Sequence, residues 1–225
     1  TIGQEGAVYY PESDPFTKVI VHGTYTTSTA NTWFEVQSST GQICYYGNTT
    51  GARQSYTAGN SPRIYAWYLD YVEDPLGNYM NYTYNKWSYC MYPNTIMYGN
   101  NKNGSTGLQN TVTFSYETRS NDPQLFVIEG VKGTMDRRLK TITSKTGSSV
   151  YRVYDLQYNT TGDASGTKYS RLTSVTERNG AGDVMQPVKL NWSYLPSLYS
   201  IPVSPQVNAA SVYPAVAFSE QQFIA

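Results

Sequence analysis

Residues that could carry out acid–base or metal chemistry are scarce in this chain of 225 residues. The single histidine, His22, lies in the run VIVHGTY. One histidine cannot build a histidine-rich metal site. As a catalytic base it would need a nucleophile elbow of the form Gly-x-Ser-x-Gly, and the sequence contains none. His22 is therefore predicted to be an ordinary strand residue.

Paired acids, phosphate loops and calcium loops are also absent from the sequence. Glu73 and Asp74 are adjacent, so on a strand they point to opposite faces and cannot serve one substrate as acid and base. The Gly-rich stretch 179–182 is not followed by a helix that could hold a phosphate. No Asp-rich calcium loop occurs. We expect no catalytic residue, no cofactor, no bound metal and hence no enzyme activity.

The two cysteines, Cys44 and Cys90, have no Cys-x-x-Cys partner that would indicate a zinc site. Two interpretations stay open: buried thiols, or a disulfide between the two. The chain also carries five Asn-x-Ser/Thr triplets, which become N-glycosylation sites only in a glycosylating secretory pathway. They begin at Asn48, Asn81, Asn103, Asn159 and Asn191.

Charge and composition restrict the partners and the location. Lys and Arg total 16, as do Asp and Glu, so the formal net charge is zero. Binding to nucleic acid or to a membrane surface usually needs a basic surplus, and no apolar run is long enough to span a bilayer. We therefore expect neither nucleic-acid binding nor membrane insertion by this segment. The low Lys and Glu content, with abundant Tyr, Thr, Ser and Asn, indicates a secreted, extracellular or cell-surface protein.

Alternation of apolar and polar residues dominates the chain, and helical periodicity is nearly absent. About eleven alternating runs, each bounded by Gly, Asn, Pro or Ser clusters, predict strands. They cover residues 19–25, 32–38, 42–47, 64–74, 79–85, 111–117, 125–130, 138–145, 150–158, 171–178 and 188–194. The predicted fold class is all-β: an extended, curved antiparallel sheet of successive hairpins with few or no helices.

An internal repeat supports this prediction. The pattern Arg-Leu-x-x-Ile/Val-Thr-x-x-x-Gly begins at Arg138 and again at Arg171, 33 positions later. A partner strand follows each copy, over 153–158 and over 188–192. Tandem units of this period usually bury a face against their neighbours, so we expect one sheet that grows by adding hairpins.

Aromatic residues concentrate in WYLDYVEDPLGNYMNYTY, residues 67–84. Residues 74–77 suit a hairpin turn, because Pro presets φ at the second position and Gly accepts a positive φ. We expect this hairpin to place Tyr71 on the same face as Met80 and Tyr82. The large rings are predicted to pack the faces of the sheet.

The last part of the chain differs in composition. Residues 1–195 are predicted to form one β-rich domain. Residues 196–225 contain four prolines, which remove backbone donors and disfavour helix at the preceding residue. We expect this segment to be a connector or strap that leads to a following module, and the chain to be a piece of a longer polypeptide.

Several short motifs follow one another in a fixed order. W-Y-L-x-x-V-x-D-x-x-G-N-x-x-x-Y-x-Y spans 67–84, and Y-P-x-x-I-x-Y starts at Tyr92. V-x-F-x-Y-E-x-R then starts at Val112, R-L-x-x-I at Arg138, and Y-R-x-Y-x-L-x-Y at Tyr151. This order resembles the N-terminal region shared by SpvB-type virulence proteins, the B components of insecticidal Tc toxins, and Rhs (YD-repeat) proteins.

The resemblance implies a fold and a role. In that family the region begins a spiralling sheet that builds a hollow shell around a toxin module, and it commonly adjoins a β-propeller. Enzymatic modules lie further toward the C-terminus, so no catalytic residue can be carried over. The resemblance thus implies a non-enzymatic structural segment of a larger secreted Rhs/Tc/SpvB-like protein, part of a β-sheet shell or scaffold that encloses or delivers a toxin module. Its partners would be other domains of the same polypeptide.

Two other functions stay open from the residues alone. A carbohydrate-binding or adhesive module would display exposed, coplanar rings that stack on glycans, and Trp33 and Trp87 are the candidates. A subunit of an extracellular filament would use residues 196–225 to add a strand to another copy of itself.

Overall fold

The computed structural model describes residues 4–24, 31–58, 61–104, 109–128, 130–159 and 169–192. The all-β prediction is confirmed, because 64% of these residues lie in strands. The single helical segment among them is a 3₁₀ turn, η1 (Thr50–Ala52). The predicted strap over 196–225 lies outside the described residues.

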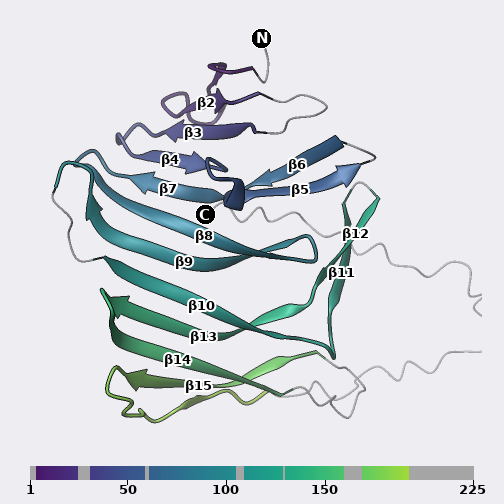
Figure 1. Ribbon diagram of the computed structural model, residues 1–225, viewed down its shortest axis with the longest axis vertical. Helices are drawn as coiled ribbons and strands as arrows, with labels where there is room; N and C mark the ends of the chain where they lie inside the picture. Colours follow the sequence, from purple (N-terminus) through teal and green to yellow (C-terminus); the bar gives the residue numbers. More distant parts are fainter. Residues whose placement is uncertain are drawn as a thin grey trace, which may run out of the picture. The chain divides into compact units, whose positions relative to one another are not determined.

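A twelve-stranded antiparallel sheet is the main element (Figure 1). Its strands follow one another in chain order, apart from two hairpins that leave the sheet and return. The strands are β1 (Val8–Tyr9), β2 (Lys18–His22), β3 (Trp33–Gln37), β4 (Ile43–Tyr46), β7 (Leu69–Glu73), β8 (Asn78–Trp87), β9 (Cys90–Asn101), β10 (Asn110–Thr118), β13 (Arg137–Thr146), β14 (Ser149–Asn159), β15 (Arg171–Asn179) and β16 (Val188–Lys189). The predicted sheet of successive hairpins is therefore present.

The two hairpins that leave the sheet were only partly predicted. They are β5 (Arg53–Ala58) with β6 (Ser61–Trp67), and β11 (Gln124–Ile128) with β12 (Val131–Met135). Residues 64–74, expected as one strand, belong to both β6 and β7. The chain changes sheet at Tyr68, whose backbone N–H donates to Ala52 O at 2.8 Å and whose carbonyl accepts from Gly47 N at 2.8 Å.

The turn between β7 and β8 forms as predicted. Gly77 has φ of 84°, and its N–H donates to Asp74 O at 2.9 Å. The register, however, corrects our expectation. Tyr71 lies opposite Asn81, and Val72 lies opposite Met80. Five residues lie between the paired positions Glu73 and Tyr79. This odd number keeps odd-numbered residues opposite odd-numbered ones, so Tyr71 shares a face with Asn81 and not with Met80.

The repeat is confirmed as a structural unit. The two copies form β13 and β15, and both pair with β14. Ile142 of the first copy lies opposite Tyr154, and Val175 of the second lies opposite Leu156. The sheet thus grows by strand addition, as the repeat predicted.

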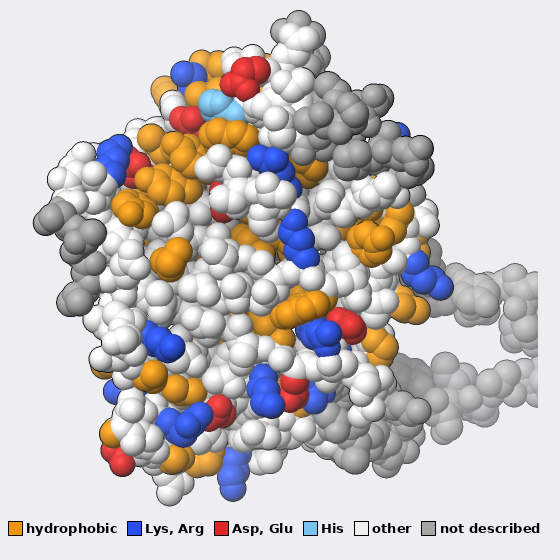
Figure 2. Space-filling view, viewed as in Figure 1, with side chains coloured by type: hydrophobic (Ala, Val, Ile, Leu, Met, Phe, Trp, Pro, Cys, Tyr) orange, Lys and Arg blue, Asp and Glu red, His pale blue; other side chains and the backbone are white. Residues whose placement is uncertain are grey.

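The register separates two faces. On one, which we call the apolar face, a direct cross-strand row runs from Val36 through Cys44 and Val72 to Met80. On the other, the polar face, a row of threonines runs through Thr83, Thr95, Thr113 and Thr143. Figure 2 shows the side on which His22 is visible, and most of it is neither apolar nor charged. Buried apolar residues are few among the described residues: Val21, Ala52, Tyr56, Cys90 and Tyr92.

Candidate functional site

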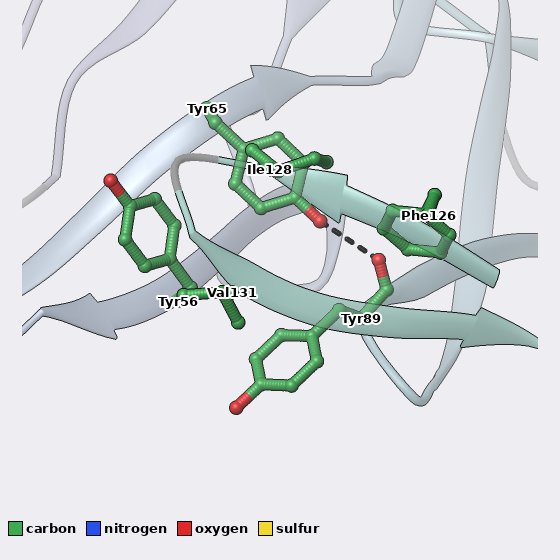
Figure 3. Close-up of a pocket in the computed structure, with 6 residues that line it drawn as sticks. All are labelled: Tyr56, Tyr65, Tyr89, Phe126, Ile128 and Val131. Carbon is green, nitrogen blue, oxygen red and sulfur yellow. Dashed lines mark hydrogen bonds between the residues drawn. The ribbon is translucent and has the colours of Figure 1, made fainter. Parts of the chain in front are cut away.

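A groove between the two outlying hairpins is the candidate site. Figure 3 shows four of its lining residues, Tyr65, Tyr89, Phe126 and Ile128, which also line an adjoining pocket with Tyr56 and Val131. The volume of the groove is about 250 Å³, and the turn that joins β8 to β9 contributes to its lining. The lining is almost entirely aromatic or sulfur-containing: Tyr65, Tyr68, Tyr89, Cys90, Met91, Phe126, Ile128 and Met135. It contains no charged side chain, so it offers apolar and aromatic contact and little else.

The groove is built on an unusual turn. Ser88 and Tyr89 both have positive φ, at 49° and 64°, a conformation that costs a residue with a Cβ about 1–2 kcal/mol. Both outlying hairpins fasten this turn. The Tyr65 hydroxyl donates to Tyr89 O at 2.8 Å, and Thr134 N donates to Ser88 O at 3.1 Å. The strained tip is thus held from two sides.

Phe126 enters the groove because its partner strand carries a glycine. Gly133 lies directly opposite Phe126, and a Cβ at this position would lie 2.1 Å from Phe126 Cζ. The ring therefore lies across the glycine and faces the groove. On the opposite face of the same hairpin, Leu125 and Val127 are exposed by 66% and 64%.

The thiol in the groove is not set up as a nucleophile. Cys90 is buried, and burial raises its pKa. Burial also raises the pKa of neighbouring Tyr92 to about 12. Both groups stay protonated at neutral pH, and a protonated thiol is a poor nucleophile.

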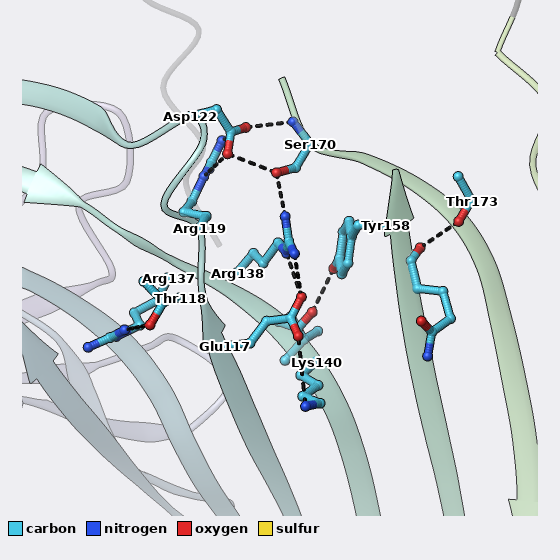
Figure 4. A network of polar contacts seen from close by, with 12 residues as sticks. Glu117, Thr118, Arg119, Asp122, Arg137, Arg138, Lys140, Tyr158, Ser170 and Thr173 are labelled. Carbon is cyan, nitrogen blue, oxygen red and sulfur yellow. Dashed lines mark hydrogen bonds and ion pairs between the residues drawn. The ribbon is translucent and has the colours of Figure 1, made fainter. Parts of the chain in front are cut away.

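A polar cluster fastens the base of the β11–β12 hairpin to the start of β15 (Figure 4). Asp122 is buried and accepts hydrogen bonds from Ser170 N at 2.6 Å and Ser170 Oγ at 2.8 Å. Arg119 forms an ion pair with the same carboxylate at 2.6 Å. Burial alone would raise the pKa of Asp122, but Arg119 and the two Ser170 donors outweigh it and hold the pKa at about 2.

Arg138 extends this cluster across three strands. Its guanidinium donates to Ser170 Oγ at 2.6 Å and pairs with Glu117 at 2.6 Å. It also lies over the Tyr158 ring, 4.8 Å from the centroid. We call the group Glu117, Arg119, Asp122, Arg138 and Ser170 the clasp. Every charge in it meets an opposite charge, so it serves cohesion and leaves no group free to act on a substrate.

His22 lies between two acids. Its ring nitrogens lie 3.2 Å from Glu5 and 3.0 Å from Glu35, and its ring stacks on Trp33 at 4.1 Å. Glu5 is 61% exposed, so one side of the group is open to water. No group of three or more potential ligands able to hold a metal occurs among the described residues.

Trp33 belongs to a ladder of rings on the polar face. Centroids of successive rings lie 4.1, 5.2, 4.9 and 5.5 Å apart. The ladder takes one ring from each of five adjacent strands: His22, Trp33, Tyr45, Tyr71 and Tyr79. Sequence reasoning missed it, because it depends on the register between strands.

The ladder does not favour Trp33 as a surface for sugar stacking. One face of its ring is covered by His22, and the edge of Tyr45 packs against it. Trp87 packs elsewhere, against Tyr92, Tyr116 and the Arg137 guanidinium. The two tryptophans thus belong to separate clusters. Glycan binding through either ring stays a prediction.

The cysteines and the glycosylation triplets can be placed as well. Cys44 and Cys90 are both free thiols, so the structure holds no disulfide between them. They lie on β4 and β9, which are separated by two strands. Three strand spacings are about 14 Å, about twice the greatest Cα distance that a disulfide spans. Asn81 is half-buried in β8, whereas the other four triplets begin at exposed residues, Asn48, Asn103, Asn159 and Asn191. Their glycosylation stays a prediction.

Comparison with known proteins identifies the family. Residues 7–128, more than half of the chain, match the family SpvB, described as Salmonella virulence plasmid 65kDa B protein. The chain belongs to the SpvB family. The family resemblance predicted from the order of the motifs is therefore confirmed. A search of curated proteins finds no match to this SpvB-family chain.

Solved structures agree with the SpvB assignment at the level of the fold. The N-terminal domain of the effector SpvB from Salmonella typhimurium strain LT2 superposes with a TM-score of 0.58 at 14% identity, over 76% of this chain and 68% of that one. The Photorhabdus luminescens Tc holotoxin pore gives 0.59 at 15% identity, over 79% of this chain and 11% of that one. The TcdB2-TccC3 complex gives 0.57 at 16%, over 78% and 11%. This chain therefore spans about a tenth of the Tc toxin chains.

Proposed function

We propose that this SpvB-family chain is a non-enzymatic structural segment of a larger secreted toxin-family protein. It forms part of a β-sheet shell or scaffold that encloses or delivers a toxin module. Its partners are other domains of the same polypeptide, such as a β-propeller and the remainder of the shell. The proposal combines family membership with one structural observation, the continuous single sheet of twelve strands.

The sheet suits a wall because the strands are joined to one another across its whole width. Consecutive antiparallel strands are joined by backbone hydrogen bonds from β1 to β16. The clasp and the fastened hairpins tie segments that lie far apart in the sequence, such as Asp122 and Ser170, 48 residues apart. The described site groups are paired or protonated, which suits cohesion better than catalysis.

The ends of the sheet are suited to continuation. Its first and last strands, β1 and β16, are two residues long. The outer edge of β15 is already bonded along most of its length, because Ser174 and Val175 pair with β16, Leu190 N donates to Thr173 O at 2.9 Å and Met185 N donates to Glu177 O at 2.9 Å. The short strands β1 and β16 are therefore the two edges of the described sheet. Backbone groups on an edge strand can accept another strand, so further strands of a longer chain can extend the wall there.

Electron cryomicroscopy of the complete polypeptide that contains this chain tests the proposal. We expect the twelve-stranded sheet to form one side of an enclosure with a C-terminal module inside it. Limited proteolysis should cleave that module slowly in the complete protein and rapidly after deletion of residues 1–195. The proposal would be contradicted if the sheet stood free of any enclosure and the protease cleaved the module equally fast in the complete protein and in the protein that lacks residues 1–195.

A further inference from the structure

The apolar face of the sheet is incompletely buried. Its central row of side chains, Val36, Cys44, Val72 and Met80, is only half-buried, and each residue lies directly opposite the next. The face of a sheet that packs inside a domain is normally buried against a second layer. Within the part of the chain that the structure describes, these positions lack such burial.

The same face continues to the far end of the sheet. Ile96 lies opposite both Tyr82 and Val112, Ile142 lies opposite both Phe114 and Tyr154, and Val175 lies opposite both Leu156 and Val188. These side chains are half-buried, except Val188, which is 66% exposed. The apolar face thus extends across nearly every strand.

An ion pair lies within this face. Arg152 and Glu177 lie on the same side as Tyr154, and they pair at 2.7 Å. A face with a surplus of one charge would repel an identical face. Arg152 and Glu177 carry opposite charges, so this pair adds no surplus. The whole chain also has a formal net charge of zero, which does not oppose self-association.

The area suits a stable interface. Twelve strands at a spacing of about 4.8 Å extend roughly 55 Å, and two rows of alternate residues occupy roughly 13 Å along each strand. The product is roughly 700 Å², close to the ~800 Å² per partner of a standard protein interface. A hollow of about 280 Å³ beside Val72, Met80 and Tyr98 could receive a side chain from the other layer.

We propose that the occupant of this face is a second copy of the chain, packed face to face about a twofold axis. The two sheets form a β-sandwich in which the rows that begin at Val36 and at Tyr82 are buried. A twofold interface must be complementary to itself, and a mainly apolar face on which Arg152 and Glu177 pair with each other satisfies this condition. This inference concerns the chain on its own and does not rest on the proposed enclosure.

Sedimentation equilibrium of the 225-residue chain and two matched variants tests the proposal. Val112→Glu places a charge on the apolar face, and Thr113→Glu places the same charge on the adjacent, half-exposed position of the polar face. We expect a dimer for the wild type and for Thr113→Glu. Val112→Glu should weaken the dimer at least about 100-fold, because an unpaired charge would be buried. Circular dichroism checks that both variants fold.

Thiol labelling provides a test without any substitution. Cys44 lies on the apolar face, and buried Cys90 is the internal reference. The rate of Cys44 labelling should fall as the protein concentration rises. The concentration at the midpoint of this fall should equal the concentration at the midpoint of dimer formation in sedimentation equilibrium. A wild-type monomer at about 100 µM, or a Cys44 rate independent of concentration, would overturn the proposal and leave the face to another part of a longer polypeptide. The proposal would also be overturned if Val112→Glu and Thr113→Glu changed the strength of the dimer equally.

Discussion

Single residues in unusual environments hold strands together in this protein. Tyr84 shows the pattern: burial raises its pKa to about 12, and its hydroxyl donates to Leu69 O at 2.6 Å, between β8 and β7. Asp122 is the acidic counterpart, with a pKa held low by neighbouring donors. Perturbed pKa values often mark active sites, but structural networks produce them too, and here the partners lie on strands that need joining.

Asp122→Asn is therefore expected to lower the free energy of unfolding by about 2 kcal/mol at pH 7. The pKa of about 2 in the folded protein lies below the ordinary value of 3.8. A lowered carboxyl pKa contributes stability above the unfolded-state value and loses it as the pH falls through the folded-state value. The difference in the free energy of unfolding between the wild type and Asp122→Asn, measured by urea unfolding, should thus narrow as the pH falls from 4 to 2.

Asp183→Asn is the matched control, because Asp183 lies on an exposed turn. It should change the free energy of unfolding by no more than about 0.5 kcal/mol. If the difference in the free energy of unfolding between the wild type and Asp122→Asn stays constant from pH 4 to pH 2, the ionised carboxylate of Asp122 is not what stabilises the clasp.

At the scale of the element, the β11–β12 hairpin carries the candidate site. Local alternation correctly predicted β11, yet β12 contains Gly133 and was missed. The glycine is what allows the ring of Phe126 to cross the hairpin and reach the groove. Glycine weakens a strand by its own propensity. Gly133 nevertheless shapes the site, because it leaves room for the ring of Phe126 on the partner strand.

Gly133→Val is expected to displace Phe126 from the groove and destabilise the hairpin by about 1–3 kcal/mol, because the new side chain would overlap the ring. Hydrogen exchange should speed up over β11 and β12 and stay unchanged over β14. Lys132→Val is the control, since Lys132 is an exposed neighbour in the same strand. Unchanged exchange in Gly133→Val would show that Phe126 does not need the glycine.

At the scale of the whole molecule, the twelve-stranded sheet is the cohesive unit. The described residues from 4 to 191 belong to one compact unit. No described helix is both long and apolar enough to cross a bilayer. The sheet's cohesion is what the proposed wall requires.

Removal of residues 196–225 is expected to leave the sheet folded, with a melting temperature within about 2 °C of the full chain. Differential scanning calorimetry of the truncated chain measures this. A fall of 10 °C or so would show that the predicted boundary at residue 195 cuts through the folded unit. If the chain forms filaments by strand addition through this segment, the same deletion should abolish them.

The sequence by itself determined the fold class, the turn at Asp74–Gly77, the tandem unit and the family resemblance. These features are local: alternation, turn residues and motif order are written within a few positions of the chain. Strands that break the local rules were missed, including β9, which runs through Pro93.

Only the tertiary structure decided the register, and with it the ring ladder, the two faces, the free thiols and the clasp. Tyr71 lies beside Tyr79 because an odd number of residues, five, separates the paired positions Glu73 and Tyr79. Ser170 reaches Asp122 because intervening strands bring positions 48 residues apart together. Shifting a strand by a single residue exchanges its two faces, so alternation reveals that a sheet exists but not which residues meet across it.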